Sequence, residues 1–154
     1  MEQSALGSFM RDSNLWTYPI VNLAHILGIA GLFGATLIID LRMLGVWRRV
    51  SLALLADVTI PVAKAGFALA ATTGVALLAT KATEYADNPY LLIKFGAIAL
   101  GLVNVALLSR WPPWRARRDR ELSQAENRRL SLIGGISLTC WLAAITAGRL
   151  IAYW

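Results

Sequence analysis

Several ionisable side chains of this sequence lie inside otherwise apolar stretches, where a charged group is unfavourable unless it has a partner. His25, Lys64, Lys94 and Arg149 each fall within an apolar run of roughly 20 residues, the length that crosses a bilayer as a helix. A charged group in the hydrocarbon costs about 3 kcal/mol or more, so such side chains usually face a bundle interior, a water-filled cavity or a ligand. They therefore predict contacts between helices or a binding site.

His25 is the candidate metal ligand. Imidazole is a common metal ligand and the usual axial ligand of haem in helix bundles. Tyr18 and Asn22 lie seven and three positions before His25, which places the three on one face of a helix. Lys94 and Arg149 fall at a similar depth in their own runs and would suit the propionates of a b-type haem. The candidate cofactor-binding residues are therefore His25, Asn22, Tyr18, Lys94 and Arg149.

The same residues also have a structural interpretation. His25 is the only histidine, so a second axial ligand would have to be a methionine, a residue of a partner chain or nothing. Its imidazole can instead hydrogen-bond a neighbouring helix, and Lys94 and Arg149 can extend toward the headgroups. The cofactor is therefore unknown, with a b-type haem as the candidate.

A second polar cluster is predicted toward the opposite membrane face. Asp40 ends the first apolar run, and Lys64 and Asn104 lie inside the second and third runs. A helical rise of about 1.5 Å per residue places all of them within roughly 10 Å of that face. An Asp40–Lys64 pair with Asn104 nearby would lower the cost of both charges. We interpret this as a structural polar pair, with a proton-handling role as the alternative.

Four apolar runs define the elements that must position these residues. They predict membrane-spanning helices at approximately 19–40, 58–80, 90–110 and 131–152. The chain is 57% hydrophobic, above the roughly 45–50% typical of soluble domains. We therefore expect an all-α integral membrane four-helix bundle that forms one domain over 1–154. Apolar residues at helical spacing over 3–12 add a short amphipathic N-terminal helix.

The net charge of +6 indicates an orientation rather than a nucleic-acid partner. The arginines concentrate in the linkers that follow the first and third runs. Cytoplasmic linkers carry an excess of basic residues, so both basic linkers are expected in the cytoplasm and both termini outside. The expected location is a cytoplasmic membrane crossed several times, with the lipid bilayer as partner and no binding of nucleic acid.

Three functional hypotheses follow, none of them enzymatic. The sequence has no Ser–His–acid arrangement, no HExxH motif and no glycine-rich phosphate loop. Gly66, Ala70 and Gly74 repeat at a spacing that lets helices approach closely, within one chain or between chains. The first hypothesis is a structural or interaction subunit in a homo-oligomer or larger membrane complex. The second is a haem- or metal-binding redox protein that uses His25, and the third is an oligomeric carrier of small ions or protons.

The chain resembles an uncharacterised family of small four-helix bacterial inner-membrane proteins over WTYPIVNLAHILGIAGLFGATLIIDLRMLG (16–45) and AGRLIAYW (147–154). The resemblance implies the same four-helix membrane fold and a location in the inner membrane of a bacterium. A histidine on the first helix followed by small residues is more loosely similar to the copper-resistance-D and cytochrome-b-like membrane families. Those families bind haem or copper through several histidines, so this second resemblance implies such a role for His25 alone.

Overall fold

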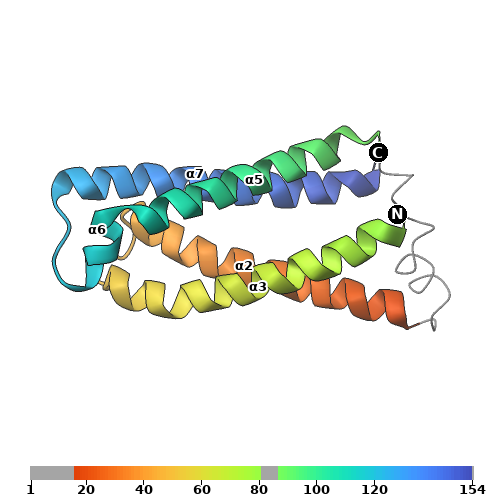
Figure 1. Cartoon of the computed structure of the whole chain (residues 1–154), viewed down its shortest axis with the longest axis horizontal. Helices are drawn as coiled ribbons and strands as arrows, with labels where there is room; N and C mark the ends of the chain where they lie inside the picture. The colour runs from red at the N-terminus through yellow and green to blue at the C-terminus, as the bar shows by residue number, and fades with distance from the viewer. Residues whose placement is uncertain (1–15, 81–86, 154) are drawn as a thin grey trace.

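The computed structural model describes residues 16–80 and 87–153, and in that part of the chain it has four long apolar helices (Figure 1). They are α2 (Thr17–Met43), α3 (Leu52–Thr80), α5 (Pro89–Arg110) and α7 (Gln124–Leu150). The short helices α6 (Pro112–Arg115), η1 (Ala116–Arg118) and η2 (Ile151–Tyr153) complete the described residues. The predicted all-α four-helix membrane bundle is confirmed. The amphipathic helix predicted at 3–12 lies outside the described residues.

Two helices begin earlier than the apolar runs predicted. α3 begins at Leu52 rather than near 58, and α7 begins at Gln124 rather than near 131. Ser123 caps α7 in a capping box with Glu126, where each side chain satisfies a backbone N–H of the other residue. Hydropathy marks the crossing of the bilayer, whereas caps mark where a helix begins, so the polar first turns of α7 were missed. The first turn of α3 is apolar, and Asp57 separates it from the run predicted at 58–80.

The first helix pair, α2 and α3, is in contact through its backbones. A Cβ added to Gly28 would lie 2.6 Å from the Ala70 nitrogen, and one added to Gly66 would lie 2.8 Å from the Gly28 oxygen. Only residues without a side chain permit such an approach. The small-residue pattern of α3 therefore serves a contact within the chain.

The second helix pair, α5 and α7, is in contact through side chains. A Cβ added to Gly101 would lie at ordinary contact distances, 3.5 Å from Cys140 Cβ and from Trp141 Cζ2. Near the other end of the pair, Asn88 Nδ2 donates to the Ile151 oxygen at 3.4 Å. The Asn88 side chain also caps α5 by accepting from the Tyr90 N–H, and Pro89 fits the first turn of the helix.

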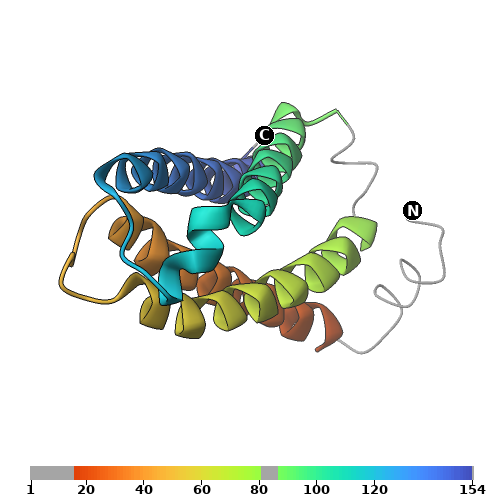
Figure 2. The same cartoon turned by 60° about the vertical axis from the view of Figure 1, so that its left-hand side comes forward.

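The two pairs meet through α2 and α7 (Figure 2). Ser131 Oγ donates to the Met43 oxygen at 2.8 Å, and Gly134 lies against Asp40 and Met43. These contacts lie toward the basic end, which we define as the end with linkers 44–51 and 111–123. Met43, Ala56, Trp114 and Leu130 form a buried apolar cluster there. Among the described helices, α3 and α5 form no comparable interface. The side of the bundle between α3 and α5 is therefore not closed by a helix–helix contact.

Candidate functional site

A cleft of about 490 Å³ lies between the two helix pairs. Its volume falls in the range of about 300–1,000 Å³ that is usual for small-molecule sites. Its walls come from all four long helices and are mostly apolar, as such sites require. The apolar lining includes Leu32, Ala35, Ile39, Ala63, Phe67, Leu102, Val105 and Leu108.

The second polar cluster predicted from the sequence, around Asp40, lines this cleft. Asp40, Lys64 and Asn104 all contribute to its wall. Asp40 is only 2% exposed, whereas the Lys64 side chain is exposed. Asn104 Nδ2 donates to the Ile133 oxygen at 3.1 Å. No ion pair within 4 Å joins Asp40 to Lys64 in the described part of the chain, so the cleft gathers both charges without direct pairing.

Unused hydrogen-bonding groups mark the cleft. Among the described residues, the buried side-chain atoms without a partner are Asp40 Oδ2, Arg117 Nε and Trp141 Nε1. All of these residues line the cleft. A buried polar group without a partner costs about 1–3 kcal/mol, and native proteins normally satisfy such groups with protein, water or a ligand. The buried donors and acceptors that lack a partner are therefore gathered around this cleft.

Trp141 closes the cleft toward the middle of the bundle. Its ring stands edge-to-face with Phe67 of α3, with ring centroids 6.4 Å apart and an interplanar angle of 67°. Trp141 is 5% exposed and lies beside Gly101 of α5, which leaves room for the indole. Sequence reasoning did not select Trp141, because a tryptophan in an apolar run is typical of a core.

Arg117 lies at the basic end of the cleft, and among the described residues it has no acidic hydrogen-bond partner. Its guanidinium group lies 4.3 Å from the Trp114 ring centroid, and Nη1 donates to the Trp114 oxygen at 2.7 Å. Burial, followed by the charge of Arg118, lowers the pKa of Arg117, while Asp57 acts in the opposite direction. By contrast, the hydrogen bond that Arg118 donates to Asp57 raises the pKa of Arg118. Arg117 is therefore a partly buried cation whose side chain donates to a backbone oxygen.

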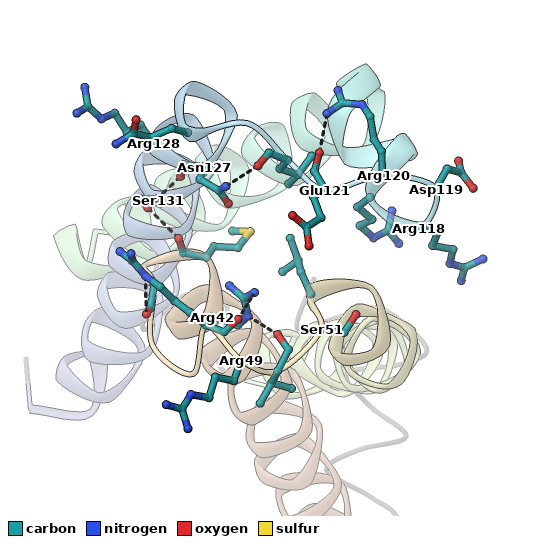
Figure 3. A pocket seen from close by; sticks show the side chains of 18 residues that line it. Arg42, Arg49, Ser51, Arg118, Asp119, Arg120, Glu121, Asn127, Arg128 and Ser131 are labelled. Carbon is teal, nitrogen blue, oxygen red and sulfur yellow. Dashed lines mark hydrogen bonds between the residues drawn. The ribbon is translucent and has the colours of Figure 1, made fainter.

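A basic pocket of about 1030 Å³ lies between the two linkers (Figure 3). Arg42 lies beside Arg49 and Ser51 in the lower part of the view, while Arg49 and Arg128 extend outward. Arg42 Nε donates to the Val50 oxygen at 2.7 Å and holds the turn that contains Gly45, whose φ is +100°. The charged lining comprises Arg42, Arg48, Arg49, Arg117, Arg118, Arg120, Arg128, Asp119 and Glu121. Basic residues outnumber acidic ones, so the pocket favours anionic groups.

The structure brings together only some of the candidate cofactor-binding residues predicted around His25. His25 Nδ1 lies 3.1 Å from Thr73 Oγ1, and its ring packs against Gly74 of α3. Lys94 is close enough to His25 for a Coulomb interaction and lies against Gly148 of α7. The hydrogen bond with Thr73 agrees with the structural interpretation of His25, in which its imidazole bonds a neighbouring helix. The partner is a hydroxyl group.

The other residues predicted for that site do not gather around His25. Arg149 Nη2 bonds the Tyr153 hydroxyl at 2.6 Å, and Tyr18 and Asn22 are exposed on α2. None of the residues predicted to hold a cofactor lines the cleft or the basic pocket. Within the described residues, no group of three or more His, Cys, Asp and Glu side chains is placed to hold a metal ion. A haem or metal at His25 stays a prediction.

The cleft combines apolar walls with a few separated polar groups. Asp40 offers an acceptor, and Trp141 and Arg117 offer donors that no protein group uses. This arrangement suits a mostly apolar molecule that carries its own hydrogen-bonding groups. Comparisons of the chain with protein-family models, with curated proteins and with solved structures give no match.

Proposed function

We propose that this small integral membrane protein binds a lipid-soluble molecule in the cleft between its two helix pairs. The observation that carries the proposal is that Asp40, Arg117 and Trp141 hold unpartnered buried polar atoms and line the same cleft. A ligand with both an acceptor and a donor would satisfy them. Each hydrogen bond to the ligand would remove the free-energy cost of a buried polar group without a partner.

The bilayer is the natural source of the ligand. The cleft walls are mostly apolar, and the side of the bundle between α3 and α5 has no helix–helix interface in the described residues. A molecule dissolved in the membrane can reach the cleft from that side without crossing water. The distribution of arginines supports a cytoplasmic basic end with both termini outside, and the resemblance of the chain to bacterial inner-membrane proteins supports that membrane as its location.

The unsealed α3–α5 side also favours a second candidate function, that of an interaction subunit. A helix of a second copy or of a larger membrane complex could cover this side instead of a ligand. Cysteine cross-linking between Val103→Cys on α5 of neighbouring copies, in a Cys140→Ser background, tests the homo-oligomer. The oligomeric ion or proton carrier stays a prediction, tested by flux into proteoliposomes.

Analysis of bound molecules in the purified protein tests the first proposal. The full chain is purified in a mild detergent, and native mass spectrometry and solvent extraction measure what it retains. We expect a retained molecule at one copy per chain, reduced about tenfold in Asp40→Asn and in Trp141→Phe, because each variant loses about one hydrogen bond. Asp57→Asn and Trp111→Phe are matched controls, because Asp57 and Trp111 do not line the cleft.

Two results would overturn the proposal. The first is wild-type protein that retains no molecule even after incubation with total membrane lipid. The second is equal retention by the cleft variants and their controls, which would place the bound molecule elsewhere on the bundle.

A further inference from the structure

We propose that the ligand is an anionic amphiphile whose phosphate or carboxylate lies at Arg117 and whose apolar chain lies in the cleft. This inference rests on the proposed function, because it names the chemical class of the molecule that the cleft holds. It follows from the position of Arg117, from its unused donor and from the balance of charge around it.

The cleft and the basic pocket adjoin each other. Met43 and Arg117 line both of them. On one side of Arg117 the walls are mostly apolar, and on the other side they carry arginines. An amphiphile has the same division, with an apolar chain and a charged head. Its charged head would lie where the two cavities meet.

Arg117 has a donor to offer at this position. Its Nε is buried without a partner, and its Nη1 donates to a backbone oxygen rather than to a carboxylate. The nearby Arg118 and Arg120 are already paired, with Asp57 and Glu126 respectively. The planar guanidinium fork binds phosphate and carboxylate through paired hydrogen bonds. An acidic head at Arg117 would therefore supply the missing acceptor, and a negative charge beyond that of Asp57, which is already paired with Arg118.

The balance of charge favours an anion over a cation or a zwitterion. The charged side chains that line the cleft are Lys64, Arg117 and Asp40, two basic and one acidic. Lys64 has no ion pair within 4 Å among the described residues. Asp40, whose Oδ2 accepts from no group, suits a hydroxyl or other donor elsewhere on the same molecule. The basic pocket beyond Arg117 adds further positive charge.

Quenching of tryptophan fluorescence by brominated chains tests the inference. Trp114 and Trp141 line the cleft, so bromine atoms on a chain bound there would quench them. The full chain is reconstituted in phosphatidylcholine nanodiscs with equal small fractions of one added lipid. The added lipids carry the same dibrominated chain on phosphatidylglycerol, on phosphatidylcholine or on a free fatty acid. The first and third separate a phosphate head from a carboxylate head.

We expect stronger quenching by one or both anionic lipids than by phosphatidylcholine, with most of the difference lost in Trp141→Phe. Arg117→Gln should weaken the anionic preference about tenfold, the equivalent of one charged hydrogen bond, and Arg117→Lys should restore part of it. Arg115→Gln removes the same charge from a side chain that lines neither cavity and should leave the preference intact.

The outcomes separate the two proposals. Equal quenching by anionic and zwitterionic lipids in the wild type, or an equal loss in Arg115→Gln and Arg117→Gln, would overturn the anionic amphiphile. If the purified protein still retained a molecule that depends on Asp40, the cleft would remain a binding site for a ligand of another class. If it retained none, both proposals would fail.

Discussion

The contact between α2 and α3 and the cleft between the helix pairs have opposite effects on the stability of the fold. At the first, glycines bring two backbones together, and His25 and Thr73 join the helices through side chains. At the second, Asp40 and Trp141 are buried with polar atoms that no protein group satisfies. The close backbone contact therefore stabilises the first helix pair. Groups that reduce stability are concentrated in the cleft, as is typical of functional sites.

The largest effect is expected where the backbones touch. Gly66→Leu places a side chain against the Leu32 nitrogen and the Gly28 oxygen, neither of which can move without separating α2 from α3. We expect a loss of about 3 kcal/mol or more in the free energy of unfolding, measured by circular dichroism in mixed micelles of SDS and dodecyl maltoside. Gly96→Leu is the control, because a Cβ at Gly96 meets nothing within 4 Å. Equal losses in both variants would show that the close contact carries no special stability.

A substitution in the cleft should have the opposite sign. Asp40→Asn removes a buried carboxylate with an unpartnered oxygen, so the ligand-free protein should keep its stability or gain about 1 kcal/mol. The same unfolding assay measures this after delipidation, with Asp57→Asn as the control. A loss comparable to that of Gly66→Leu would instead identify Asp40 as a structural lock between helices.

A smaller loss is expected where His25 of α2 meets α3, far from the basic end. His25→Ala removes the hydrogen bond to Thr73, and interhelical hydrogen bonds in membrane proteins average about 0.6 kcal/mol. A double-mutant cycle with Thr73→Ala measures the coupling free energy. The visible spectrum of the purified wild type is the accompanying test. A Soret band that disappears in His25→Ala would establish the haem alternative in place of a purely interhelical role.

The smallest effect is expected at the linkers. Arg118 and Asp57 form an ion pair between exposed side chains, and such pairs are screened by water and salt. Arg118→Gln should leave the unfolding transition unchanged within error at high ionic strength. A clear destabilisation that persists in high salt would show that this pair fastens the second linker to α3.

Hydropathy predicted the fold because the bilayer imposes one strong rule on sequence. A run long enough to cross must be apolar and helical, and the four predicted spans each correspond to a long helix among the described residues. The ends were less well predicted, since the capped first turn of α7 at Ser123 is polar and lies beyond the apolar run. Which helices pair closely also depended on tertiary contacts, because glycines occur in every run.

The candidate site was predictable only in part. Asp40, Lys64 and Asn104 were grouped from their depth alone, and the structure brings them to one cleft because helical rise fixes depth. Arg117 and Trp141 were missed. An arginine in a basic linker satisfies the positive-inside rule, and a tryptophan in an apolar run is ordinary core. What distinguishes them is a missing partner, which is a property of the packed molecule and not of residue type.

The pairing of neighbouring helices also sets an order of assembly during synthesis. Gly28, Gly66 and Ala70 are all present once the first pair has left the ribosome, so that pair can form while the second is still being translated. The contact between Met43 and Ser131 spans 88 positions and must wait for α7. The cleft is therefore completed last, and a lipid already in the membrane can occupy it as the second pair closes over the first.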